Sequence, residues 1–199
     1  MNVADPIVSV VPSLHGPVLA VLARTNTPLR QADVHRLAAA GSYSGVRKVL
    51  IQLVEHGVVE EVPGGFRLNR DHLAADAIVQ LASLHGVLAE RLRRWAAGHE
   101  VVEFVGMFGS IARRDGDETS DIDVLVIADH LPAEDRSVLR DELTDLLARW
   151  TGNDGHVQVL DHGAVTRLVD EQAPIVESWA DDLQPVVGQP PPLRPAVRT

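Results

Sequence analysis

The chain has 199 residues, 45% of them hydrophobic, and a formal net charge of −10 at pH 7. It contains no cysteine, which excludes disulfide bonds and thiolate metal sites. No apolar run is long enough to span a membrane, and the first residues lack the basic-then-apolar pattern of a signal peptide, so we expect a cytoplasmic protein with no membrane partner.

The charge is distributed unevenly along the sequence. Residues 1–70 carry seven basic and five acidic side chains, a net charge of +2, which leaves −12 for residues 71–199. A split of this kind indicates two modules with different partners.

The first module, residues 1–70, has a pattern of three helices followed by a hairpin. Thr27 and Pro28 are typical of a helix start, Ser44 is a candidate N-cap, and Pro63-Gly64-Gly65 is a turn signal. The predicted elements are helices over Pro17–Ala23, Thr27–Ala39 and Gly45–His56, and strands over Val58–Val62 and Phe66–Asn69. This order, with the run Ser-Gly-Val-Arg-Lys-Val-Leu, resembles the winged helix-turn-helix of bacterial transcription regulators.

The resemblance implies that the third helix enters the major groove of DNA. Tyr43, Ser44, Arg47 and Lys48 would then face the DNA, and Arg67 in the wing would touch phosphate. The alternative is a structural or protein-binding module, because a charge of +2 is small for a surface that must neutralise phosphates.

Residues 71–98 are predicted to form one connecting helix, with Gly86 as its weak point. Its apolar side chains recur at near-heptad spacing, at Leu73, Ala77, Leu81, Leu84, Leu88 and Leu92. This stripe packs either on both modules or on a second copy in a homodimer. Arg91, Arg93 and Arg94 either bind nucleic acid or form a solvated helix face.

The most informative segment runs from residue 106 to residue 127. A predicted buried strand over Val101–Phe108 is followed by Gly109, which allows the backbone to turn sharply and approach a ligand closely. Ser110 is a candidate cap for a short helix over residues 111–114, whose free N–H groups attract phosphate. Arg113 and Arg114 add positive charge beside that turn.

Two carboxylates follow at the start of the next predicted strand. Asp121 and Asp123 are separated by one residue, so their side chains share one face of the strand, about 7 Å apart. Carboxylates this close repel one another and favour a hard cation between them. Mg²⁺, which usually binds together with substrate phosphates, is the cation that we expect here.

The Gly-Ser pair, Ala-Arg-Arg-x-Gly and Ser-Asp-Ile-Asp-Val-Leu-Val together resemble the signature of the DNA polymerase β-type nucleotidyltransferase superfamily. The resemblance is strongest to its minimal nucleotidyltransferase branch, which is similar to the antibiotic adenylyltransferases. It implies an α+β fold for the whole chain. The winged helix-turn-helix module comes first, and residues 99–187 form a nucleotidyltransferase domain with a small mixed β-sheet flanked by helices. The resemblance also implies transfer of NMP from an NTP, by analogy ATP. Gly109 and Ser110 would hold phosphates, and Asp121 and Asp123 would be the catalytic Mg²⁺ ligands.

The third carboxylate of the family pattern has no clear equivalent. It belongs on the next core strand, predicted over His156–Leu160, where Gln158 stands at the polar position and Asp154 and Asp161 flank the strand. A neutral amide is a weaker ligand for a hard cation than a carboxylate, so the fold can be right while the activity is weak or absent. His156 either moves a proton in the site or is a polar strand end.

The remaining sequence indicates helices over about residues 132–150, 164–171 and 174–180. Residues 188–199 are Pro-rich and are predicted to form a disordered tail. The nine histidines form no zinc-binding pattern.

Two classes of function are therefore predicted. In the first, the chain is a Mg²⁺-dependent nucleotidyltransferase that modifies a hydroxyl of a protein, an RNA end or a small molecule. In the second, it is a DNA-binding transcriptional regulator or the antitoxin partner of a toxin, and its transferase domain is catalytically weak or only senses nucleotide. The Gly-Ser and Asp-x-Asp pattern favours the first class, whereas Gln158 and the winged-helix pattern favour the second.

Overall fold

The computed structural model describes residues 1–3 and 5–193. The internal contacts divide the chain into two compact units, with the boundary between Val87 and Leu88. Met1 and Val3 group with the second unit. Among the helices that the structure describes, none is both long and apolar enough to cross a membrane.

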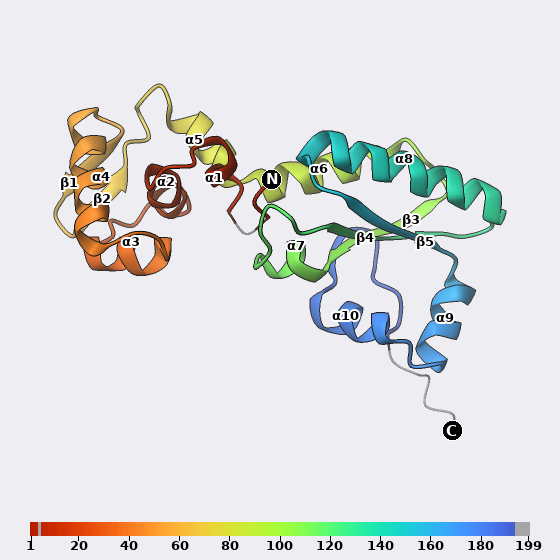
Figure 1. The fold of residues 1–199 in the computed structure, drawn as a ribbon. Helices are drawn as coiled ribbons and strands as arrows, with labels where there is room; N and C mark the ends of the chain where they lie inside the picture. The colour runs from red at the N-terminus through yellow and green to blue at the C-terminus, as the bar shows by residue number, and fades with distance from the viewer. Residues whose placement is uncertain (4, 194–199) are drawn as a thin grey trace. The chain divides into compact units, whose positions relative to one another are not determined.

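The first unit consists of helices and one hairpin. Its elements are α1 (Ile7–Val10), α2 (His15–Ala23), α3 (Gln31–Ala38), α4 (Tyr43–Glu55), β1 (Val59–Val62), β2 (Gly65–Leu68) and α5 (Ala75–Ala82), shown in Figure 1. Buried apolar side chains of α2, α4 and α5 form one core with residues of both strands. The three predicted helices and the predicted hairpin are present, and α1 is an additional helix that the sequence pattern did not indicate.

Two helix starts differ from the predicted ones. The second predicted helix begins at Gln31 rather than Thr27, because Leu29 is extended and exchanges two backbone hydrogen bonds with Phe66 of β2. The N-cap of α4 is Ser42 rather than Ser44, and its hydroxyl accepts the Gly45 N–H at 3.1 Å.

The predicted single helix over residues 71–98 is wrong. α5 ends at Ala82, and a separate helix, α6, runs over Leu84–Ala97. The Ser83 hydroxyl donates to the Val79 carbonyl at 2.7 Å, a local bond of the kind that bends helices. Leu73, which the predicted stripe included, is fully exposed before α5 begins.

The second unit is built around a four-stranded mixed sheet. Its strands are β3 (Val102–Phe108), β4 (Ile122–Ala128), β5 (Gly155–Leu160) and β6 (Gln184–Val187), in the order β5-β4-β3-β6. β4 is parallel to β5 and antiparallel to β3, and β6 is antiparallel to β3. The sheet and its flanking helices confirm the α+β fold class expected for this part of the chain.

Helices cover both faces of this sheet. α6 and α8 (Ala133–Thr151) lie on one face, and α9 (His162–Asp170) and α10 (Pro174–Asp182) lie on the other (Figure 1). Alternate residues of β4 supply the two cores, with Ile122 and Val124 packed toward α6 and α8 and Leu125 toward α9 and α10. Asp123 shares the face of Leu125, at the beginning of the strand.

The C-terminal part of the chain differs from the prediction. β6, which the sequence pattern did not indicate, pairs Gln184 with Met107 of β3, and the Gln184 amide donates to the Ala112 carbonyl at 2.6 Å. Of the predicted disordered tail, residues 188–193 are described, and Leu193 packs against the core beneath α9 and α10. Residues 194–199 lie outside the described part of the chain.

Candidate functional site

The turn between β3 and α7 (Gly109–Arg113) brings the backbone against a carboxylate. Gly109 has φ +67°, a conformation that favours glycine, and Phe108 before it pairs with Asp123 of β4. A Cβ added to Gly109 would overlap the Asp123 Oδ2. Ser110, the predicted cap, lies instead within α7, which begins at Gly109 without a side-chain cap.

We therefore expect Gly109→Ala to destabilise the second unit by about 2–4 kcal/mol, through the left-handed backbone and the overlap with the Asp123 carboxylate. Gly152→Ala is the matched control, because Gly152 has φ +74° but open space around an added Cβ. Urea unfolding followed by tryptophan fluorescence measures both variants. If they lose the same free energy of unfolding, the close approach to Asp123 has no energetic consequence.

Asp123 is the half-buried carboxylate of the site. Its side chain is 21% exposed, and its Oδ1 lies 3.2 Å from Nδ1 of His156, the residue opposite it on β5. Burial raises the pKa of the Asp123 carboxyl above its ordinary value, and the nearby Asp121 charge adds to this, while His156 and Arg113 oppose it. Burial of the carboxylate, rather than its charged neighbours, therefore determines the direction of this shift.

This pKa shift gives a pH dependence with a defined sign. A carboxyl whose pKa is raised on folding binds its proton more tightly in the folded state, so its ionisation lowers stability as the pH rises through the raised pKa. We expect Asp123→Asn to increase the free energy of unfolding of the nucleotide-free protein at pH 7 to 8, and this gain to shrink toward pH 4.5. Urea unfolding across this range measures it, and a gain that does not change with pH would contradict the assignment.

Asp121 lies in the exposed segment just before β4, at the end of an ordered loop. Within that loop the Asp117 carboxylate accepts the Thr119 N–H and the Thr119 hydroxyl, each at 2.8 Å, and the Ser120 hydroxyl at 3.2 Å. The bonds from Thr119, followed by those from Ser120, lower the pKa of Asp117. These local bonds fix the backbone that leads into Asp121.

Asn153, which the sequence analysis did not single out, joins this loop to the end of α8. It is 5% exposed, and its Nδ2 donates to the carbonyls of Ser120 at 2.9 Å and Glu118 at 3.2 Å. It also binds the main chain of Met1, whose ammonium group donates to Asn153 Oδ1. An asparagine in a polar turn carries no sequence signal for such a role, because its partners lie more than 30 residues away in the sequence.

The other residues predicted to bind phosphate are Ser110, Arg113 and Arg114, and they differ in how free their side chains are to do so. The Ser110 hydroxyl lies beside Gly116, where an added Cβ would be 2.9 Å from its oxygen. Arg113 donates to Asp115 at 2.9 Å and also to Asp182, and these bonds raise the pKa of its guanidinium. Arg114 is exposed, with φ +60° at the end of α7.

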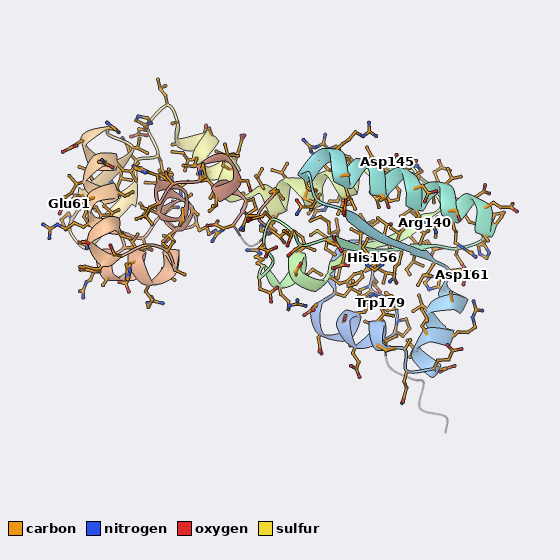
Figure 2. The ribbon with its side chains drawn as sticks, in the orientation of Figure 1. Glu61, Arg140, Asp145, His156, Asp161 and Trp179 are labelled. Atoms are coloured by element: carbon orange, nitrogen blue, oxygen red, sulfur yellow. The ribbon has the colours of Figure 1, made fainter. Side chains whose placement is uncertain are left out.

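The two candidates for the third position do not join Asp123. Gln158 lies on the same face of β5 as His156 but opposite Leu125, two register pairs further along the sheet. Asp161 lies beyond the other end of β5 from His156 (Figure 2), where its carboxylate accepts the Ala164 N–H at 2.6 Å and the Arg136 guanidinium at 2.9 Å. The residue beside Asp123 is therefore His156.

The donor set fits one magnesium ion better than two. Asp121 and Asp123 supply two carboxylates at the beginning of β4, and Mg²⁺ is commonly held by one or two carboxylates together with substrate phosphates and water. Within the described residues, no three histidine, aspartate or glutamate side chains form a group that could hold a metal ion alone.

The predicted DNA-facing residues lie together on the first unit. Tyr43, Ser44, Arg47 and Lys48 are all exposed on α4, and the exposed fraction of Tyr43 is 52%. Arg67 of β2 instead forms an ion pair with Glu60 of β1 at 2.8 Å, so its charge is already partnered.

Comparison with known proteins gives one result for this chain. Residues 90–163 match the family model described as "Polymerase beta, Nucleotidyltransferase", and no curated protein or solved structure matches. The matched segment runs from within α6 to the beginning of α9 and contains Gly109, Asp121, Asp123 and His156. The match supports the assignment of this domain, residues 90–163, to the nucleotidyltransferase superfamily.

Proposed function

We propose that the protein is a Mg²⁺-dependent nucleotidyltransferase that transfers NMP from an NTP to a hydroxyl acceptor. The observation that carries this proposal is the close approach of the Gly109 backbone to the Asp123 carboxylate. A glycine turn held against the Asp123 carboxylate, with Asp121 two residues before it, is suited to a triphosphate that carries a metal ion, because phosphate and metal ion then meet in one place. The match over residues 90–163 supports the same reaction class.

In this proposal the acceptor oxygen bonds to the α-phosphorus while the bond from that phosphorus to the α–β bridging oxygen breaks. Pyrophosphate leaves with the electron pair, and the acceptor proton passes to solvent or to a base. The turn at Gly109 and the Ser110 hydroxyl orient the phosphates, and Asp121 and Asp123 hold the metal ion. When bound, Mg²⁺ would neutralise charge on the triphosphate.

His156 has a positioning role in this arrangement. His156 contacts Asp123 from β5, the parallel neighbour of β4. The register of this strand pair places the two residues opposite one another. His156 therefore fixes the Asp123 carboxylate relative to the Gly109 turn.

Labelled nucleotides test the proposal directly. The purified chain is mixed with each α-³²P-labelled NTP, with Mg²⁺ or with EDTA, in the presence of protein and RNA fractions of a cell extract. We expect Mg²⁺-dependent label on one class of acceptor, and calorimetry should show NTP binding that requires Mg²⁺. If no NTP binds and none is turned over, the enzyme proposal fails.

A second candidate function is DNA binding by the first unit, as in a transcriptional regulator or an antitoxin. It is favoured by the exposure of Tyr43, Arg47 and Lys48 on α4 and by the absence of a carboxylate at Gln158. Capture of genomic DNA fragments by the wild-type chain, lost in Arg47→Ala/Lys48→Ala, would support it. Equal capture by wild type and variant would exclude recognition through α4.

A further inference from the structure

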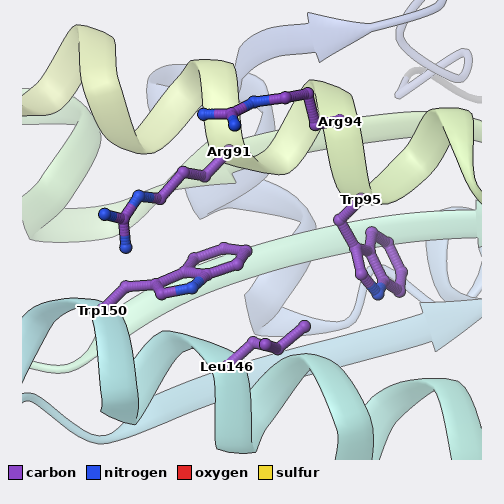
Figure 3. Close-up of a pocket in the computed structure, with 5 residues that line it drawn as sticks. All are labelled: Arg91, Arg94, Trp95, Leu146 and Trp150. Carbon is purple, nitrogen blue, oxygen red and sulfur yellow. The ribbon is translucent and has the colours of Figure 1, made fainter.

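A pocket lies on the other side of the sheet from Asp123. It has a volume of about 560 Å³ and lies between α6 and α8, as Figure 3 shows. Its lining residues are Arg91, Arg94, Trp95, Leu146 and Trp150. α6 and α8 cover the face of the sheet opposite to the one that Asp123 shares with Leu125, so this pocket is separate from the proposed catalytic site.

The walls of the pocket are held by two contacts between antiparallel helices. The Arg91 guanidinium lies 5.5 Å from the ring centroid of Trp150, and one turn later Trp95 Nε1 donates to Glu142 at 3.0 Å. Glu142 precedes Trp150 by two turns of α8, so α6 and α8 run in opposite directions here. These two contacts place both indoles along the groove between the helices.

The positive charge of the pocket is incompletely paired. Within the part of the chain that the structure describes, no carboxylate oxygen lies within 4.0 Å of the Arg91 guanidinium. Arg94 is 69% exposed, and the one carboxylate among the described residues that it reaches is Glu90, at 4.0 Å. Arg93 also contacts Glu90, at 3.4 Å. The chain as a whole has a net charge of −10, so two incompletely paired guanidinium groups beside an indole indicate a binding site for an anion.

We propose that this pocket binds a nucleotide unit of a single-stranded nucleic acid. A base stacks on the Arg91–Trp150 pair, with Leu146 beneath it, and its phosphate accepts hydrogen bonds from the Arg91 and Arg94 guanidinium groups. Indole rings stack on any base, and guanidinium groups bind phosphate through two parallel hydrogen bonds.

The arrangement in Figure 3 favours this ligand over an acidic peptide. Both guanidinium groups lie on the same side of the pocket as the Trp150 ring, so one flat group and one anionic group are recognised side by side. A nucleotide carries a planar base and a phosphate at short separation, whereas an acidic side chain carries the anion without the planar surface. A free nucleotide shares this chemistry, and the experiment distinguishes it from a strand.

The test uses the full chain with Arg47→Ala/Lys48→Ala as the parent, which removes any contribution from α4, and EDTA, which removes metal-dependent binding at Asp123. Fluorescein-labelled oligouridylate of twelve nucleotides is titrated by anisotropy, together with quenching of tryptophan fluorescence. We expect Arg91→Ala/Arg94→Ala to weaken binding at least about tenfold and Trp150→Phe to weaken it severalfold with most of the quenching lost. Arg93→Ala, on the same helix but outside the pocket lining, should change affinity less than twofold.

The competitors identify the source of the ligand. Displacement by UMP at the same nucleotide concentration shows that the pocket takes free nucleotides, and displacement by the unlabelled oligomer alone shows that it takes a strand; both support recognition of a base and phosphate. Unchanged binding by Arg91→Ala/Arg94→Ala, an equal loss in Arg93→Ala, or stronger displacement by an acidic peptide of equal charge overturns the proposal. The more conservative Trp150→Phe keeps the test valid if the double arginine variant does not fold.

Discussion

Replacing Asp123 by asparagine is expected to lower nucleotidyl transfer about 10²- to 10³-fold while the protein remains folded. The amide keeps the size of the side chain but removes the charge that holds the metal ion beside the Gly109 turn. Asp121→Asn should have a similar effect on transfer, because the two carboxylates act on the same ion. Transfer of label from an α-³²P-labelled NTP, followed against Mg²⁺ concentration, measures both variants.

Asp129→Asn provides the matched control. Asp129 follows the other end of β4 and has a side chain of similar exposure, 27%. Among the described residues its charged partner is His130 alone. Its replacement should leave transfer unchanged. If Asp123→Asn retains wild-type activity, or if Asp129→Asn loses as much, the carboxylates at the beginning of β4 are not the catalytic ones.

Replacing Asn153 by alanine is expected to lower the free energy of unfolding of the second unit by about 1–3 kcal/mol. The substitution leaves the carbonyls of Glu118 and Ser120 without their buried donor. We also expect transfer to fall about tenfold, because the loop that carries Asp121 is then less well positioned. Urea unfolding followed by tryptophan fluorescence is a selective measurement, because Trp95, Trp150 and Trp179 all lie in the second unit.

A further variant tests the bonds to the loop themselves. Asn153→Asp retains an acceptor but loses the donors, so it should be at least as harmful as Asn153→Ala. Wild-type stability in Asn153→Asp would show that the bonds to the loop contribute nothing.

The elements that the sequence predicted best are those whose signals are local. Gly109, Asp121 and Asp123 lie within 15 residues, and the turn conformation and strand alternation that bring them together depend only on neighbouring residues. Their geometry follows from the register of one antiparallel pair, Phe108 with Asp123. The sequence therefore indicated the centre of the candidate site.

The surroundings of the site depend on contacts between distant residues. The parallel pairing of β4 and β5 places His156, rather than Gln158, beside Asp123. Asp161 is unavailable because it caps α9 and accepts a hydrogen bond from Arg136, and neither partner is visible in the periodicity of the sequence. The strand β6 was missed for the same reason, since among the described strands the short run Gln184–Val187 pairs only with β3. The break at Ser83 was missed although its hydrogen bond to Val79 is local, because a serine inside a helical pattern does not by itself indicate a break.

The position of β6 has a consequence for the newly synthesised protein. β6 is the last strand that the structure describes, yet it pairs with β3, the first strand of the sheet, which was made more than 70 residues earlier. Until the ribosome has released that segment, the nascent domain presents β3 as an open edge, the kind of edge to which other chains add. We therefore expect premature termination before residue 184 to yield an aggregation-prone fragment, even though such a fragment contains every residue of the proposed catalytic site.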